Sequence, residues 1–276
     1  ASTGPVVAGT DPVPALPGAA SSAVSASESA SPETQAETDP GIVPGRPGFT
    51  ESRGVVPVRA VQFEAGYGLA RDTDDSVQSQ QHAWPGVVVR TGLTPRLELR
   101  VAGFGVLTQR DRFFDNSPTT RATAASDVQV GFKAIIASEE HFPLELSLIP
   151  MVSVPVGGAP FSSGELDPNV TLAFGRALPH GFDLTGLARA ASLTADGARE
   201  MQYSASVLVS RDIAPGWNAF GEAFYVTGAG ADRQWNMDVG LARRLTRLIQ
   251  LDVSVGHSIN EAAPDWTVST GVVFRK

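Results

Sequence analysis

Residues 86–105 read GVVVRTGLTPRLELRVAGFG, and the second half of this stretch alternates strictly between apolar and polar side chains. Leu97, Leu99 and Val101 point to one side of an extended chain, whereas Glu98, Arg100 and Ala102 point to the other. Another extended run precedes it, and the glycine, threonine and proline between the two runs suit a tight turn. The stretch therefore predicts a β-hairpin with one apolar face and one charged face.

The composition narrows the possible functions. The 276 residues include no cysteine, which rules out disulfides and thiolate metal sites. No apolar run is long enough for a transmembrane helix, and a net charge of -8 argues against nucleic acid as a partner. We expect no cofactor. Because the chain starts at Ala1 and not at a methionine, we expect that a signal peptide has been removed.

The first part of the chain differs from the rest. Residues 1–50 hold eight of the 20 prolines, five acidic residues and a single basic residue, Arg46. Such a composition buries too little apolar surface to offset the entropy of ordering. We therefore predict that residues 1–54 form a disordered periplasmic arm. This arm is either a flexible tail or a binding segment, in which case the Pro-rich residues 1–50 bind a periplasmic or envelope protein.

Residues 55–276 predict one all-β domain, because strand-like alternation recurs along its whole length. The even number of strands fits a closed antiparallel barrel of about 12 strands. The expected strands are 58–71, 83–91, 96–108, 124–136, 142–156, 166–176, 181–192, 201–210, 216–228, 234–244, 248–259 and 265–275.

A soluble barrel would show the same alternation, but two features favour a transmembrane barrel. Short turns alternate with longer connections, at least over the first two thirds of the domain, as in outer-membrane barrels whose long loops face outwards. Aromatic residues on the apolar faces gather at both strand ends, which predicts two membrane-interface girdles. The short-turn girdle comprises Phe142, Phe174, Phe182, Trp217 and Phe274, and the long-loop girdle comprises Tyr203, Tyr225, Trp235 and Trp266. We expect the arm and the C-terminus to share the periplasmic side.

Four stretches carry a resemblance to a known family. They are TGLTPRLELR at 91–100, DVQVGFK at 127–133, LIPMVSVPVG at 148–157 and APDWTVSTGVVFR at 263–275. The chain resembles, from about residue 55 to its end, the outer-membrane family named for transport in the phenol meta-cleavage degradation pathway. That resemblance implies small phenolic or hydrocarbon solutes. The chain departs from the common outer-membrane pattern by ending on Arg275 and Lys276 instead of an aromatic residue.

The sequence does not favour an enzyme. His257 and Ser258 superficially resemble a hydrolase pair, but neighbouring residues of a strand point to opposite faces and cannot easily share a proton. One expected outer loop gathers Asp72, Asp74 and Asp75, which are either simply solvated or a weak Ca²⁺ site. We expect no catalytic residues and, on balance, no metal.

The polar face is the best candidate for function. Charged side chains are expensive on a lipid-facing surface, so we expect this face to line the lumen. The expected pore-lining residues are Glu64, Glu98, Arg100, Asp127, Lys133, Glu145, Asp183, Arg189, Glu222, Asp238 and Asp252. Three are basic and eight are acidic, which favours cations or neutral solutes over anions. The same residues could instead pair and close the barrel.

Two functions stay open at this point. The first is an outer-membrane channel or transporter for small solutes, neutral and aromatic or cationic. The second is a closed structural barrel whose arm binds an envelope partner. Both predict the outer membrane of a Gram-negative bacterium, with its lipids as partners.

Overall fold

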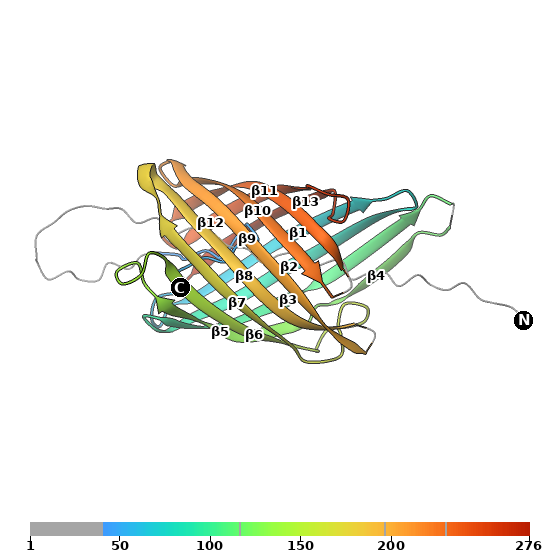
Figure 1. Cartoon of the computed structure of the whole chain (residues 1–276), viewed down its shortest axis with the longest axis horizontal. Helices are drawn as coiled ribbons and strands as arrows, with labels where there is room; N and C mark the ends of the chain where they lie inside the picture. The colour runs from blue at the N-terminus through green and yellow to red at the C-terminus, as the bar shows by residue number, and fades with distance from the viewer. Residues whose placement is uncertain (1–40, 116, 196, 230) are drawn as a thin grey trace, which may run out of the picture.

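The computed structural model describes residues 41–276 apart from residues 116, 196 and 230, and from Val61 onwards these residues form one antiparallel sheet of thirteen strands (Figure 1). A single 3₁₀ turn, η1 (Pro179–Gly181), lies between two of the strands. No helix in the described part of the chain is long and apolar enough to cross a membrane. The strands are β1 (Val61–Thr73), β2 (Val77–Thr94), β3 (Leu97–Phe113), β4 (Thr120–Ala125), β5 (Val128–Ala137), β6 (Glu145–Val154), β7 (Asp167–Ala177), β8 (Phe182–Ala195), β9 (Ala198–Ala214), β10 (Trp217–Gly228), β11 (Ala231–Thr246), β12 (Ile249–Ser258) and β13 (Trp266–Arg275).

The sheet closes on itself, because β1 pairs with β2 on one side and with β13 on the other. Each remaining strand pairs with the next along the chain, except that β4 and β5 both pair with β3, one above the other. Counting β4 and β5 as one interrupted strand, the thirteen strands make a barrel of twelve. The predicted all-β, twelve-stranded antiparallel barrel is confirmed.

The hairpin predicted from residues 86–105 is formed by β2 and β3, with Arg90 opposite Arg100. Both strands are longer than expected, because β2 starts at Val77 and leaves only residues 74–76 as the β1–β2 loop. Residues 78–81 are polar on both faces, so alternation could not mark them as a strand. The extra length carries β2, β3 and β4 beyond the rest of the barrel (Figure 1).

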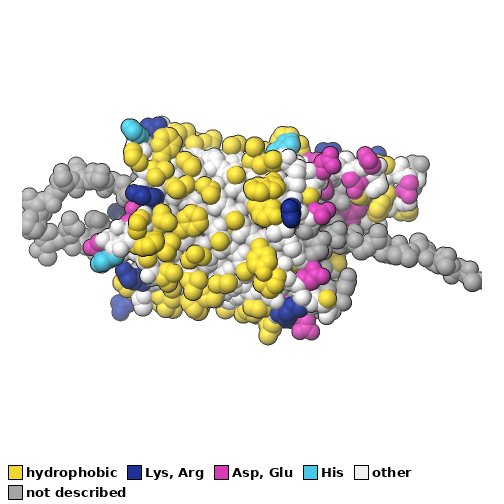
Figure 2. All heavy atoms as spheres, viewed as in Figure 1, with side chains coloured by type: hydrophobic (Ala, Val, Ile, Leu, Met, Phe, Trp, Pro, Cys, Tyr) yellow, Lys and Arg dark blue, Asp and Glu magenta, His cyan; other side chains and the backbone are white. Residues whose placement is uncertain are grey.

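The face of the barrel in Figure 2 carries a broad apolar band, and exposed apolar side chains recur on strands all round the barrel, such as Phe63 on β1, Val170 on β7 and Val239 on β11. All nine predicted girdle aromatics point outwards: seven are exposed, and Phe174 and Tyr225 are half-buried. Further exposed aromatics that the sequence analysis did not single out include Phe63, Trp84 and Phe104. An apolar, aromatic-rich exterior is the surface that a transmembrane barrel presents to lipid.

The N-terminal boundary differs from the prediction. Residues 1–40 lie outside the described residues, but residues 41–54 do not form an arm outside the barrel. Nearly all of residues 41–56 are buried, and many of their hydrogen-bond partners are inward-facing side chains of the strands. We call residues 41–56 the plug segment, because they occupy the lumen.

Candidate functional site

The plug segment makes a U-shaped excursion into the lumen from the short-turn end. It begins at the β11–β12 turn, where the amide of Ile42 donates to the carbonyl of Arg247 over 3.0 Å. Its deepest part is at Thr50, whose hydroxyl lies 2.6 Å from that of Ser206 on β9. The chain then returns to the short-turn end, where Val58 bridges to Gly92 and β1 follows. Both limbs of the U thus end at the same rim of the barrel.

Carboxyl groups of the wall accept hydrogen bonds from the backbone of the plug segment. Glu222 on β10 accepts the amides of Phe49 and Thr50, each over 2.6 Å, and also the Thr50 hydroxyl. Glu64 on β1 accepts the amide of Gly45 over 3.0 Å, and Glu98 on β3 accepts the amide of Val56 over 2.7 Å. A segment that pairs with no strand needs such partners, because buried backbone amides are costly when unsatisfied.

Donor side chains of the wall satisfy carbonyl groups of the plug segment in the same way. Gln62 donates to the carbonyl of Val43 over 2.7 Å, and Ser147 donates to that of Arg53 over 2.8 Å. Three basic residues also donate to carbonyl groups of this segment: Arg90 to that of Val43, Lys133 to that of Ser52 and Arg275 to that of Gly41. The inner wall is therefore complementary to this backbone conformation.

A buried ion-pair network joins the first barrel strands to the plug segment. Arg90 lies between Glu64 and Glu98, at 2.9 and 2.8 Å, and its side chain is fully buried. Arg100 pairs in turn with Glu51 of the plug segment over 2.9 Å. Removing one member of such a network leaves a buried charge uncompensated, which costs about 3–5 kcal/mol.

The plug segment also brings positive charge to the acidic side of the lumen. Arg46 contacts Asp252 over 3.3 Å and Ser269 over 2.7 Å. Arg53 contacts Asp183 over 2.6 Å and pairs with Glu139. Two arginines against one glutamate give the plug segment a net charge of +1, which offsets part of the negative charge of the wall.

Phe49 is the main apolar contact of the plug segment. Its ring stacks on that of Phe224, with centroids 4.5 Å apart and planes within 5°. Leu187 and Val226 complete this small apolar cluster. The guanidinium of Arg189 lies 5.9 Å from the centroid of the Phe49 ring, within range of a cation–π contact. The lumen therefore contains one site that holds an aromatic ring.

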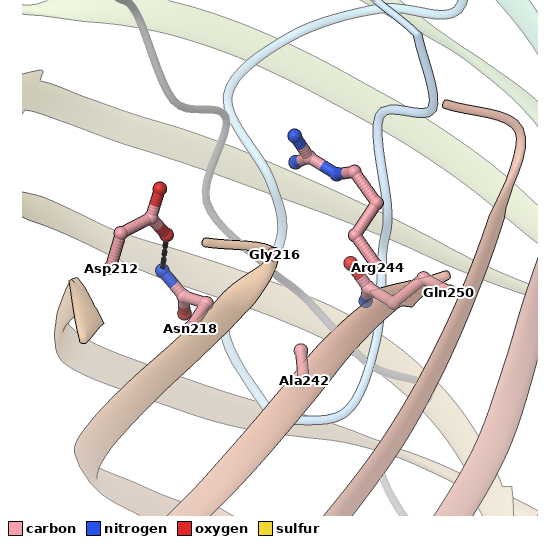
Figure 3. Close-up of a pocket in the computed structure, with 6 residues that line it drawn as sticks. All are labelled: Asp212, Gly216, Asn218, Ala242, Arg244 and Gln250. Atoms are coloured by element: carbon pink, nitrogen blue, oxygen red, sulfur yellow. Dashed lines mark hydrogen bonds between the residues drawn. The ribbon is translucent and has the colours of Figure 1, made fainter. Parts of the chain in front are cut away.

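A small cavity of about 40 Å³ remains beside the plug segment at the short-turn end (Figure 3). On one side of it Asn218 donates to Asp212 over 2.9 Å, and Arg244 and Gln250 lie on the other side. A cavity of this size holds water but no larger solute.

Comparison with protein-family models gives one match, to the family described as "Putative MetA-pathway of phenol degradation", over residues 44–275. The chain belongs to this family. The match includes most of the plug segment, so that segment is part of the family domain and not an appendage to it. No curated protein sequence matches the chain.

Solved structures support the same fold for this family member. An outer-membrane channel from Pseudomonas putida F1 superposes with a TM-score of 0.63 at 15% identity, over 81% of this chain and 98% of the other. The β domain of the Bordetella autotransporter BrkA gives 0.53 at 8% identity, over 78% and 99% of the two chains. The transport unit of the autotransporter AIDA-I from Escherichia coli gives 0.50 at 10% identity, over 79% and 89%. The chain therefore has the fold of an outer-membrane β-barrel.

Most of the predicted pore-lining residues of this family member face the lumen. Arg189, Glu145 and Asp183 do so with partial exposure, and Asp127 lies at the β4–β5 break, where it accepts the amide of Gly157 over 2.9 Å. Their role as a pore lining stays a prediction. The buried ones are Glu64, Glu98, Arg100, Lys133, Glu222, Asp238 and Asp252.

Sequence reasoning missed Arg90 and the plug segment itself. Arg90 follows three valines, so alternation alone did not separate its inward side chain from the lipid-facing ones. The plug segment was hidden by the prolines around it. A signal was present, since Arg46 and Phe49 are the first arginine and the first aromatic residue of the chain.

The remaining candidates are placed as follows. His257 is exposed on β12 and packs edge-on against Trp266, with centroids 4.4 Å apart. Asp74 accepts the backbone amides of Ser76 and Val77, which lower the pKa of its carboxyl below the ordinary value. Within the described residues, no group of three or more His, Cys, Asp or Glu side chains is arranged to hold a metal ion.

Proposed function

We propose that this protein is an outer-membrane channel for small solutes, which the plug segment closes at rest and opens by leaving the lumen. The supporting observation is that the plug segment contributes no strand to the barrel. The wall closes through β1 and β13, and β1 begins only at Val61. Displacing the plug segment would thus break hydrogen bonds and ion pairs inside the lumen but no part of the barrel ladder.

The charge of the wall favours cations and neutral solutes over anions. With the plug segment displaced, Asp252 and Asp183 would lose their arginine partners, and Glu222 would lose its three hydrogen bonds. A narrow wall with unpaired carboxylates raises the local concentration of cations and repels anions.

Between cationic and neutral solutes, the apolar cluster that holds the Phe49 ring favours neutral aromatic ones. When Phe49 leaves, Phe224, Leu187 and Val226 would present an apolar surface inside the lumen to which a ring of similar size could bind. The family description names phenol degradation, which is consistent with a phenolic solute. The proposal assigns no catalytic role to any residue.

A second function is favoured by one specific observation. Arg90, Glu98 and Lys133 are completely buried together with the plug segment, as in a permanent structural network. If the plug segment never leaves, the protein is a closed scaffolding barrel.

For either function we propose that residues 1–50 bind a periplasmic or envelope protein. Because residues 41–50 lie in the lumen, such a partner would act on residues 1–40 and could draw the plug segment outwards.

Single-channel recording in planar bilayers tests the proposal. The full-length chain is expected to be closed most of the time, and a chain that starts at Pro57 is expected to conduct steadily. A salt gradient across the bilayer should give a reversal potential of the sign expected for cations. Heat-modifiability on gels confirms that the shortened chain is folded. A folded chain without the plug segment that does not conduct would support the closed barrel instead.

A further inference from the structure

The projecting ends of β1 to β4 carry an arginine row on their outer face. Register places Arg71 of β1 opposite Gln80 of β2, Gln80 opposite Arg110 of β3, and Arg110 opposite Arg121 of β4. Residues directly opposite each other in adjacent strands lie on the same face of a sheet. The three arginines, all exposed, thus form one line across four strands, which we call the arginine row.

The arginine row has no counter-charge of its own. No carboxylate forms an ion pair with Arg71, Arg110 or Arg121 in the described part of the chain. The acidic residues beside the row on β1 and β3, Asp72 and Asp111, alternate with these arginines and so face the other side of the sheet. Figure 2 shows acidic side chains gathered on the projecting end of the molecule. The two faces of the projection therefore differ in charge.

Arg110 and Arg121 are moreover like charges in directly opposed positions, which destabilises a strand pair. Arg112, exposed and two residues further along β3 on the same face, adds a fourth positive charge. Such an arrangement is stable when an anion lies over it, and guanidinium groups bind phosphate with paired hydrogen bonds.

The position of the arginine row along the membrane normal indicates which kind of anion it binds. On the same face of β3, Val106 is 43% exposed and belongs to the apolar band, as does Trp84 of β2 at 61%. Arg110 lies four residues beyond Val106, which is about 13 Å along a strand and about 10 Å along the membrane normal for a tilted barrel strand. This is the level of the lipid head groups. With the short turns towards the periplasm, the arginine row faces the outer leaflet.

We propose that the arginine row binds the phosphorylated head group of a glycolipid of the outer leaflet, chemically a lipid A phosphate. The site lies on the lipid-facing surface and is independent of the plug segment. It would fix the projecting sheet against the membrane surface and compensate the repulsion between Arg110 and Arg121.

Native mass spectrometry of the full-length protein in detergent, titrated with lipid A, tests this proposal. The triple variant Arg71→Gln, Arg110→Gln, Arg121→Gln is expected to bind bisphosphorylated lipid A about tenfold or more weakly than the wild type. Lipid A with the same acyl chains but without phosphates should bind the wild type as weakly as the variant. Arg121→Gln alone should give a smaller loss in the same direction.

A matched control uses three outward arginines near the short turns. The variant Arg176→Gln, Arg211→Gln, Arg243→Gln removes the same charge and should keep wild-type affinity for lipid A. Equal affinity of the wild type and of the arginine-row variant would overturn the proposal, as would equal binding of the dephosphorylated lipid. Displacement of lipid A by millimolar inorganic phosphate would also overturn it, since the row would then be a site for free anions.

Discussion

The replacement Glu222→Gln is expected to open the channel by weakening the deepest attachment of the plug segment. The Glu222 carboxyl group accepts three hydrogen bonds there, from the amides of Phe49 and Thr50 at 2.6 Å each and from the Thr50 hydroxyl. A glutamine keeps one acceptor oxygen, whereas its NH₂ group would face a donor. The variant therefore loses at least one buried hydrogen bond and gains a donor–donor contact.

The size of the effect follows from that count. One lost buried hydrogen bond costs about 1–3 kcal/mol. Because about 1.4 kcal/mol corresponds to a factor of ten in an equilibrium constant, the ratio of open to closed molecules should rise about 5- to 150-fold. The barrel itself is unaffected, because the ladder between β10 and its neighbours uses only backbone groups. The overall stability of the barrel should then change little.

Single-channel recording measures this ratio as the fraction of time spent in the conducting state. The matched control is Asp238→Asn, on the strand position directly opposite Glu222. In the described residues Asp238 is a buried lumen carboxyl with no hydrogen bond to the plug segment, so its neutralisation should change the open fraction much less than Glu222→Gln does. Equal open fractions for Glu222→Gln and the wild type would refute the reasoning, provided that a chain starting at Pro57 conducts.

Three further predictions also concern the lumen. Glu98→Gln should lower the temperature of the heat-modifiable gel shift, because it leaves buried Arg90 short of one carboxylate at a cost of about 3–5 kcal/mol; an unchanged shift would contradict the buried network. Gly48→Ala should raise the open fraction, since its Cβ would lie 2.5 Å from a Glu222 oxygen, whereas Gly221→Ala meets nothing within 4 Å and should behave as wild type. A chain starting at Pro57 should give a cation-selective reversal potential in a KCl gradient, and an anion-selective one would contradict the acidic-lumen argument.

The barrel could be predicted from sequence because each strand carries its own alternating pattern and the same pattern recurs along the chain. Alternation along β3, β5 and β12 reports directly which side chains face lipid, and the turns between strands carry glycine and proline. Of the predicted pore-lining residues, ten lie on the lumen face for that reason. The projection of β2 and β3 was missed because it extends beyond the apolar part of the membrane, where both faces are polar and alternation is lost.

The plug segment could not be predicted in the same way, since its conformation is set by partners far away in sequence. Arg46 meets Asp252 and Phe49 meets Phe224 only after the barrel has closed. A Pro-rich composition with few aromatic residues is typical of disordered chains when read locally. Charged groups of the wall, not local propensity, hold this segment in place. The structure also changes the interpretation of Glu98. Alternation along the strand predicts an unpaired charge in the lumen, whereas in the structure Glu98 forms an ion pair with Arg90.

A reversible cross-link tests most directly whether movement of the plug segment opens the channel. The hydroxyls of Thr50 and Ser206 lie 2.6 Å apart, and the chain contains no cysteine, so Thr50→Cys with Ser206→Cys introduces one defined disulfide. We predict that the oxidised protein never conducts in a planar bilayer and that the same protein conducts after a reductant is added. Equal conductance before and after reduction would contradict the account.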